Sequence, residues 1–302
     1  MANVVSHGSV DTDSLAHDPV LATPVARPVL ARPVLARPGE ELRWPASAIW
    51  RAGEPAIRKI GVADLVDALR KGFEDFKAVP SHLVFLAVIY PVVGLILGRL
   101  FLGYDVLALV YPVLAGLTLI GPVLAIGLYE ISRRLEAGLP TTLRNGLDVF
   151  DNPSKGAIAR LSIFVFGLFF QWLALAHIMY RQLLGATPPE TLQAFANQVL
   201  TTPNGQQMML SGNLLGFIFA IIVLMTSVVS FPMLVDRHTG AAVAVRTSIR
   251  AVLENPLTMA LWGLIVAAAL LVGCLTLFVG LALVLPILGH ATWHLYRKVV
   301  EP

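Results

Sequence analysis

The stretch that decides the fold is residues 257–298, LTMALWGLIVAAALLVGCLTLFVGLALVLPILGHATWHLYRK. Its apolar run, 257–288, is too long for one transmembrane helix, which needs about 20 residues. A turn between Gly273 and Gly280 divides the stretch into two spans that form a hairpin. The segment before it, VAVRTSIRAVLENP, is amphipathic and ends in an Asn-Pro pair, which favours a helix start. We therefore predict a surface helix, then a membrane hairpin, then a basic segment where the chain leaves the membrane.

The composition indicates a polytopic helical membrane protein. Of the 302 residues, 56% are hydrophobic and only 14% are charged, and the charges lie between long apolar runs. The net charge of +3 comes from Lys and Arg beside the spans, so we expect no nucleic-acid partner. The single cysteine, Cys274, excludes an intrachain disulfide and a thiolate metal cluster. The first residues are acidic and lack an apolar core, so we expect no cleavable signal peptide.

Two regions of different character divide the chain. Residues 1–56 are expected to form a disordered cytoplasmic tail, because the proline-rich run ARPVLARPVLARP favours extended backbone over helix. Residues 57–300 are expected to form one membrane domain. It has three modules, at about 57–135, 136–240 and 241–300.

The three modules share short motifs in the same order. Each has an amphipathic arm that carries an aligned arginine and ends at a proline, followed by a second span with a proline in register. These residues are Arg70, Arg144 and Arg246, then Pro80, Pro153 and Pro256, then Pro122, Pro232 and Pro286. The pattern predicts an all-α fold with six transmembrane helices as three repeated hairpins, each preceded by a cytoplasmic amphipathic interfacial helix.

The predicted spans lie near 82–102, 106–130, 157–180 and 208–235, and two lie within 257–297. Between the third and fourth spans, Thr187, Pro188 and Glu190 form a capping box that predicts a helix on the outer face. Basic residues cluster at the other ends of the spans, which places both termini in the cytoplasm.

With the modules laid out, the chain resembles the bacterial integral-membrane domain-of-unknown-function family 2189. The likeness covers roughly residues 58–300 and is carried by PSHLVFLAVIYPVVG, GPVLAIGLYEISRRLEAGLP, SFPMLVDRHTGAAVAVRTSIRAV and LPILGHATWHLYRK. Some members of this family carry a provisional label as a cytochrome c oxidase subunit. The resemblance implies a location in the bacterial inner membrane, and it supplies no catalytic residues.

The histidines do not support an oxidase core. Such a core needs axial histidines for two haems and further histidines for copper, all at membrane depth. The predicted spans contain His177 near the outer end and His290 and His294 near the inner end, with His82 at a mouth. A haem between the two groups would have to bridge most of the ~30 Å hydrocarbon core.

The repeat alignment brings out one candidate polar cluster at the cytoplasmic ends of the second spans. It consists of Glu130, Asp236, His238, His290 and His294. His290 and His294 are four residues apart and share a helix face, and the others converge with them if the hairpins pack around one axis. Two imidazoles and two carboxylates suit a divalent metal or a pH-sensitive lock. Alternatively, they anchor helix ends, so we assign no metal, catalytic or cofactor-binding residue and predict no cofactor.

The middles of the predicted spans contain no ionisable residue, and the chain contains no catalytic motif, so we do not expect an enzyme. Our first hypothesis is a non-enzymatic accessory or assembly factor, whose partners are the lipid bilayer and other inner-membrane proteins. The alternative is a channel or transporter for a small or lipidic solute. A metal- or haem-bearing redox subunit is a weaker alternative.

Overall fold

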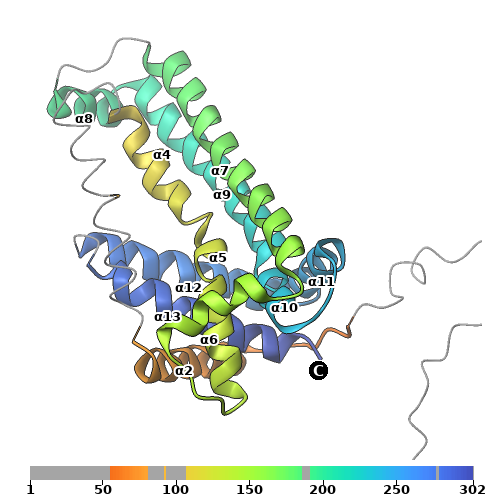
Figure 1. Cartoon of the computed structure of the whole chain (residues 1–302). Helices are drawn as coiled ribbons and strands as arrows, with labels where there is room; N and C mark the ends of the chain where they lie inside the picture. The colour runs from red at the N-terminus through yellow and green to blue at the C-terminus, as the bar shows by residue number, and fades with distance from the viewer. Residues whose placement is uncertain (1–54, 81–91, 93–106, 186–190, 277–278, 302) are drawn as a thin grey trace, which may run out of the picture. The chain divides into compact units, whose positions relative to one another are not determined.

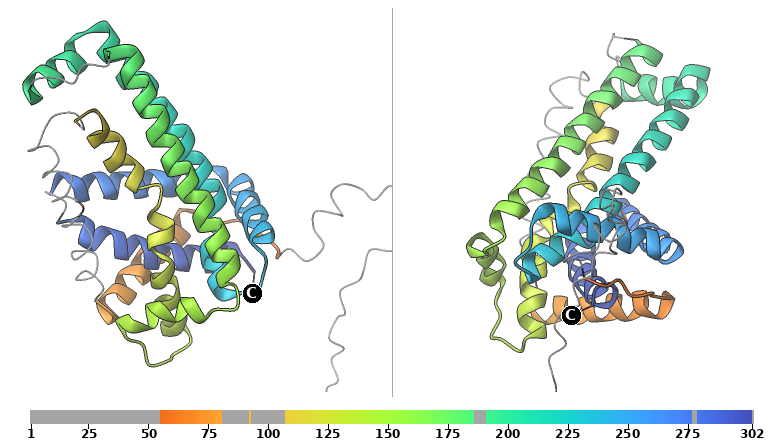
Figure 2. Two further views of the ribbon diagram at one scale, coloured as in Figure 1. Left: turned by 45° about the horizontal axis from the view of Figure 1, so that its top comes forward. Right: turned by 90° about the vertical axis from the view of Figure 1, so that its right-hand side faces the viewer.

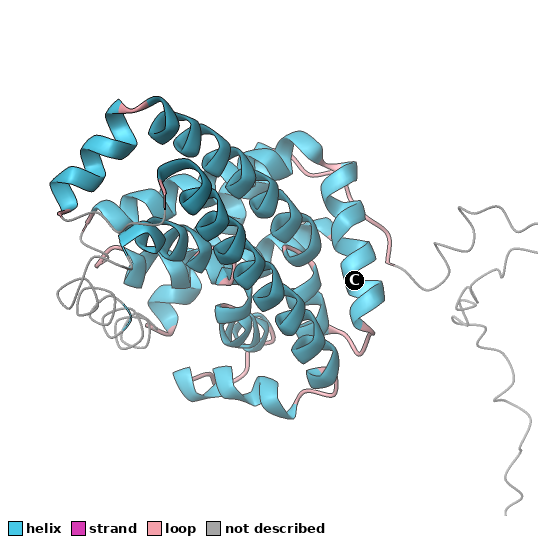
Figure 3. Cartoon of the chain, turned by 90° about the horizontal axis from the view of Figure 1, so that it is seen from above, coloured by secondary structure: helices cyan, strands magenta, loops and turns pink. Residues whose placement is uncertain are grey.

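The computed structural model describes residues 55–80, 92, 107–185, 191–276 and 279–301, which belong to one compact unit, Glu54–Pro302. In these ranges the named elements are all helices (Figures 1 and 3). The predicted all-α class is confirmed. The predicted tail, apart from residues 55 and 56, and the predicted span at 82–102, apart from residue 92, lie outside the described residues.

Three of the helices are long and apolar enough to cross a membrane. They are α7 (Lys155–Leu184), α9 (Pro203–Ser227) continued by α10 (Ser230–Asp236), and α12 (Pro256–Leu275). The first two lie side by side, with α4 (Leu107–Leu117) against α7 and α8 (Leu192–Thr201) against α9 (Figures 1 and 2). A small cluster of buried apolar residues, which includes Trp172 and Phe219, joins this group.

The prediction of six spans is not confirmed. The predicted span at 106–130 is interrupted, and the chain there forms α4, α5 (Gly121–Leu124) and α6 (Ile126–Glu136). The last helix, α13 (Leu281–Val299), is not among the three candidates, and its C-terminal half is polar and packs inside the protein.

The matched prolines explain where the helices break. The α-helical hydrogen-bond pattern is interrupted at residues 118–120 and again at 228–229, just before Pro122 and Pro232, although Val228 and Val229 keep right-handed helical dihedrals. A proline ring clashes with the carbonyl four residues earlier and lacks an N–H, so it favours a break at that place. Pro286 lies inside α13 and does not break it. The helix begins at Leu281, so the carbonyl with which the proline ring would clash, that of Ala282, lies in the first turn.

The three predicted arms are helical. They are α2 (Val62–Ala78), the 3₁₀ helix η2 (Leu143–Asp151) and α11 (Ala241–Glu254). Of these, α2 packs on α13, η2 on α6, and α11 on both α9 and α10. The arm of one module thus contacts a helix of the module before it, and the first arm contacts the last helix.

The contact between α2 and α13 is unusually close. A Cβ atom on Gly72 would lie 2.5 Å from the backbone nitrogen of Ala291, so only glycine fits there. Leu65 and Ala68 are buried on the same face of α2. Next to it, the end of α13 pairs with the segment before α2, where the Arg58 N–H donates to the Val299 carbonyl at 2.8 Å.

The predicted start of α12 is found, whereas the predicted start of α7 is not. Asn255 is the N-cap of α12 with Pro256 at its first position, as predicted. The prediction of an N-cap at Asn152 is wrong, because α7 begins at Lys155 with Ser154 as its N-cap, and Asn152 ends η2 instead. The predicted capping box at Thr187 lies outside the described residues, and α8 is capped by Thr191, whose hydroxyl accepts from the Ala194 N–H.

Candidate functional site

A buried polar network joins α2, α6 and α13. The Ser132 hydroxyl donates to Asp75 Oδ2 at 2.6 Å and lies 2.8 Å from His290 Nδ1. His294 Nε2 lies 2.8 Å from the same carboxylate oxygen of Asp75. Four side chains, which we call the His–Ser–Asp–His network, are therefore connected in series from His290 to His294.

The hydrogen bonds define the protonation of His290. A serine hydroxyl has one proton, and Ser132 donates it to Asp75, so its oxygen accepts from His290 Nδ1–H. A second proton, on Nε2, would be a donor without an acceptor, because Nε2 is buried and has no hydrogen-bond partner among the described residues. His290 is thus held as the neutral Nδ1–H tautomer.

Burial keeps His290 neutral. Its side chain is 0% exposed, and loss of hydration lowers its pKa to about 4, although the nearby Asp75 raises the pKa and His294 lowers it further. The residue lies in the polar half of α13, outside the three candidate spans. The imidazole is uncharged at neutral pH.

Helix geometry brings these side chains together. His290 and His294 lie one turn apart on α13, where His290 contacts Ser132 of α6 and His294 contacts Asp75 of α2. Asp75 follows Gly72 by about one turn of α2, so the close approach at Gly72 brings its carboxylate within reach. Ser132 comes from α6, which also packs on α13.

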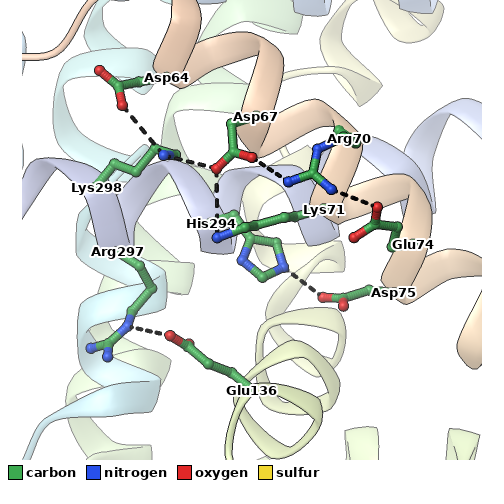
Figure 4. Close-up of polar contacts among 10 residues, drawn as sticks. All are labelled: Asp64, Asp67, Arg70, Lys71, Glu74, Asp75, Glu136, His294, Arg297 and Lys298. Atoms are coloured by element: carbon green, nitrogen blue, oxygen red, sulfur yellow. Dashed lines mark hydrogen bonds and ion pairs between the residues drawn. The ribbon is translucent and has the colours of Figure 1, made fainter.

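Ion pairs flank the network along the same interface (Figure 4). Lys298 lies 2.9 Å from Asp67 and 3.3 Å from Asp64, and Arg297 lies 3.1 Å from Glu136. The Lys298 ammonium, together with Arg70, holds the pKa of Asp67 below its usual range. These partly buried pairs join α13 to α2 and α6 on either side of the buried network.

The five residues of the predicted polar cluster have different surroundings. His290 and His294 belong to the network. Glu130 is buried on α6 and pairs with Arg133 at 2.7 Å, and Asp236 accepts from the Tyr296 hydroxyl at 2.6 Å. His238 lies exposed just after α10. No group of three or more His, Cys, Asp or Glu side chains among the described residues is placed to hold a metal ion.

Sequence reasoning missed Asp75 and Ser132. Asp75 is one of several carboxylates on an amphipathic helix, and no local signal distinguishes it from Asp67 or Glu74. Only the packing of the first arm on the last helix selects it. The Ser132 side chain is fully buried, whereas the His294 and Asp75 side chains remain 11% and 14% exposed.

Part of the chain matches a known protein family. Residues 110–236 match a family of proteins described as "Predicted integral membrane protein (DUF2189)". The resemblance seen in the sequence is confirmed over this range, which includes α7, α9 and α10. No curated protein and no solved structure matches the chain. Asp75, His290 and His294 lie outside the matched range, so their role has to be inferred from geometry.

Proposed function

We propose that the protein is a non-enzymatic accessory or assembly factor of the bacterial inner membrane that docks on a partner protein through α2. The observation that carries this proposal is an apolar stripe on the outer side of α2. Val62 and Val66 are 59% and 60% exposed, and Phe73 is also exposed on this helix. Residues 62, 66 and 73 share one helical face, and α2 already covers α13 with its other apolar face.

The charge of α2 favours a protein over a membrane surface as the partner of this stripe. Helices that lie on anionic membranes are rich in Lys and Arg. In contrast, α2 carries four acidic residues and three basic ones, namely Asp64, Asp67, Glu74 and Asp75 against Arg70, Lys71 and Lys77. A helix with a slightly negative charge gains little from an anionic lipid surface.

The packing of the inner ends supports an accessory role over the alternative of a channel or transporter. The helices α6, α10 and α13 contact one another pairwise. The large side chains there, which include Phe231, Trp293 and Tyr296, are at most 1% exposed. A solute path between these three helices would have to displace this core.

We also propose that the fold is a closed threefold repeat of six spans with both termini in the cytoplasm. The cyclic packing of the three arms on α13, α6 and α10 supports this arrangement. In such a ring, the hydrogen bonds between the segment before α2 and the end of α13 close the last interface.

Photo-cross-linking in intact cells tests the docking proposal. A photoreactive residue at Val66 should give a discrete adduct with one inner-membrane protein, which also co-purifies in stoichiometric amount in mild detergent. The matched position is Leu210 on α9, which is also apolar and exposed but lies in a candidate span. It should give lipid adducts.

Loss of the protein should lower the amount of the partner's assembled complex, and re-expression should restore it. If Val66 gives only lipid adducts and no stoichiometric companion is recovered, the accessory role is wrong.

A further inference from the structure

A cleft outside the polar network lies between α6, η2 and the start of α7. Its volume is about 890 Å³, which is within the range of small-molecule sites. The walls are apolar and include Leu128 and Ile131 from α6, Leu143 and Leu147 from η2, and Ile158 and Ala159 from α7. An apolar ligand segment would be well accommodated there.

Two glycines hold the walls of this cleft close together. A Cβ on Gly127 would lie 3.0 Å from the Gly146 carbonyl oxygen, and one on Gly146 would lie 3.2 Å from the Gly127 carbonyl oxygen. Backbone contact therefore fixes η2 against α6. Beyond this contact η2 leaves Leu147 and Phe150 63% and 68% exposed, although both line the cleft.

The cleft carries positive charge and no compensating negative charge. Arg144 and Lys155 line it, whereas no acidic residue does. Neither cation makes a hydrogen bond or ion pair with any other described residue, and both are exposed. Lys155 is also the first residue of α7, where the helix dipole adds positive potential.

The cleft lies beside the first turns of a candidate membrane-spanning helix, α7. Its lining follows α7 from Lys155 to Ser162, and α7 is a candidate span. Directly beyond, Ile163 and Phe170 are exposed on the same helix, as expected of a surface that faces acyl chains. Lys155 is thus at the start of the span, where phospholipid phosphates lie.

We propose that this cleft binds one anionic phospholipid, with an acyl chain against the apolar walls and the phosphate at Arg144 and Lys155. Arginine and lysine both bind phosphate, and arginine can do so with two parallel hydrogen bonds. The excess of two positive charges favours a lipid with net negative charge over a zwitterionic one. This inference is independent of the docking role proposed for α2.

Native mass spectrometry of the full chain in mild detergent, titrated with phosphatidylglycerol or phosphatidylcholine, tests the site. The wild-type protein should retain one phosphatidylglycerol and lose phosphatidylcholine readily. Arg144→Gln with Lys155→Gln should weaken phosphatidylglycerol binding about 25-fold, because each basic residue near an anionic headgroup contributes roughly a fivefold change in affinity. Ala159→Trp, which fills the apolar part without changing charge, should also reduce binding.

The matched control is Lys77→Gln with Arg181→Gln. Both residues are exposed cations that do not line the cleft, so the net charge changes equally. Equal losses in the control and the cleft variant, or equal retention of the two lipids by the wild type, would overturn the proposal. So would a photo-cross-link from position 159 to residues 1–54 in place of lipid. Unchanged thermal unfolding of each lipid-free variant establishes that the losses do not come from misfolding.

Discussion

His294 Nε2 lies 2.8 Å from Asp75 Oδ2, and this contact joins residues that are 219 positions apart in the chain. It links the first arm to the last helix, and Ser132 and His290 extend it into the interior. The first arm, α2, and the last helix, α13, are thus bound to each other although they stand at opposite ends of the membrane domain in the sequence. Substitutions at this interface measure how much these contacts stabilise the protein.

Replacing Asp75 with Ala should destabilise the protein by about 2 kcal/mol, because Ser132 and His294 lose their common acceptor inside the protein. Thermal unfolding in detergent measures this change. Glu74→Ala is the control, since that exposed side chain pairs with exposed Arg70, and it should cost less than about 0.5 kcal/mol. Similar losses in both variants would mean that the network contributes nothing specific.

Stability should fall as the pH drops from about 6.5 to 4. His290 has a pKa of about 4 in the folded protein, against 6.5 for an ordinary histidine, so the unfolded chain binds the extra proton in this window. This histidine contributes a slope of at most about 1.4 kcal/mol per pH unit. His290→Gln should flatten the dependence measured by unfolding at several pH values. An equally steep profile in this variant would assign the effect to other groups.

Gly72→Ala should push α2 away from α13 and cost roughly 1–3 kcal/mol, because the added Cβ meets the Ala291 backbone rather than a flexible side chain. Gly167→Ala is the matched helical control, since nothing lies within 4 Å of its Cβ. It should be neutral or slightly stabilising. Limited proteolysis of α2 and thermal unfolding report the two outcomes, and a stable Gly72→Ala protein would refute the close contact.

Asn255→Ala should loosen the segment before α2. The buried Asn255 side chain accepts from the Ile60 N–H at 2.9 Å and donates to the Arg58 carbonyl at 3.1 Å. Its removal leaves these groups without partners, at a cost of about 1–3 kcal/mol. Hydrogen exchange at residues 57–61 should rise. Asn197→Ala, at an exposed position on α8, should leave that exchange unchanged.

Reporter fusions test the proposed topology. Fusions after Gly138, Gly240 and Pro302 should report the cytoplasm, and one near Asn204 should report the periplasm. Gly138 and Gly240 are exposed between helices, so insertion there leaves the core intact. A periplasmic signal at the C-terminus would contradict the division of residues 257–297 into two spans.

The sequence by itself determined the membrane class and the positions of three of the six predicted spans, and it located the prolines beside which the helices break. These properties are local. A run of apolar residues matches the bilayer thickness whatever surrounds it, as in α7 and α12, and Pro122 and Pro232 disfavour helix just before themselves through their own ring. The same reasoning failed at Asn152, because the 3₁₀ turn that ends there delays the start of α7.

Only the tertiary structure decided which polar residues meet. The spacing of His290 and His294 predicted a shared face, but their partners Asp75 and Ser132 come from two other helices. In the repeat alignment Asp236 matches His290 and Glu130 matches His294, yet Glu130 binds Arg133 and Asp236 binds Tyr296. The physical reason is that a buried hydrogen bond needs its partner within about 3 Å, and helix packing sets that distance. No periodicity in a single sequence encodes it.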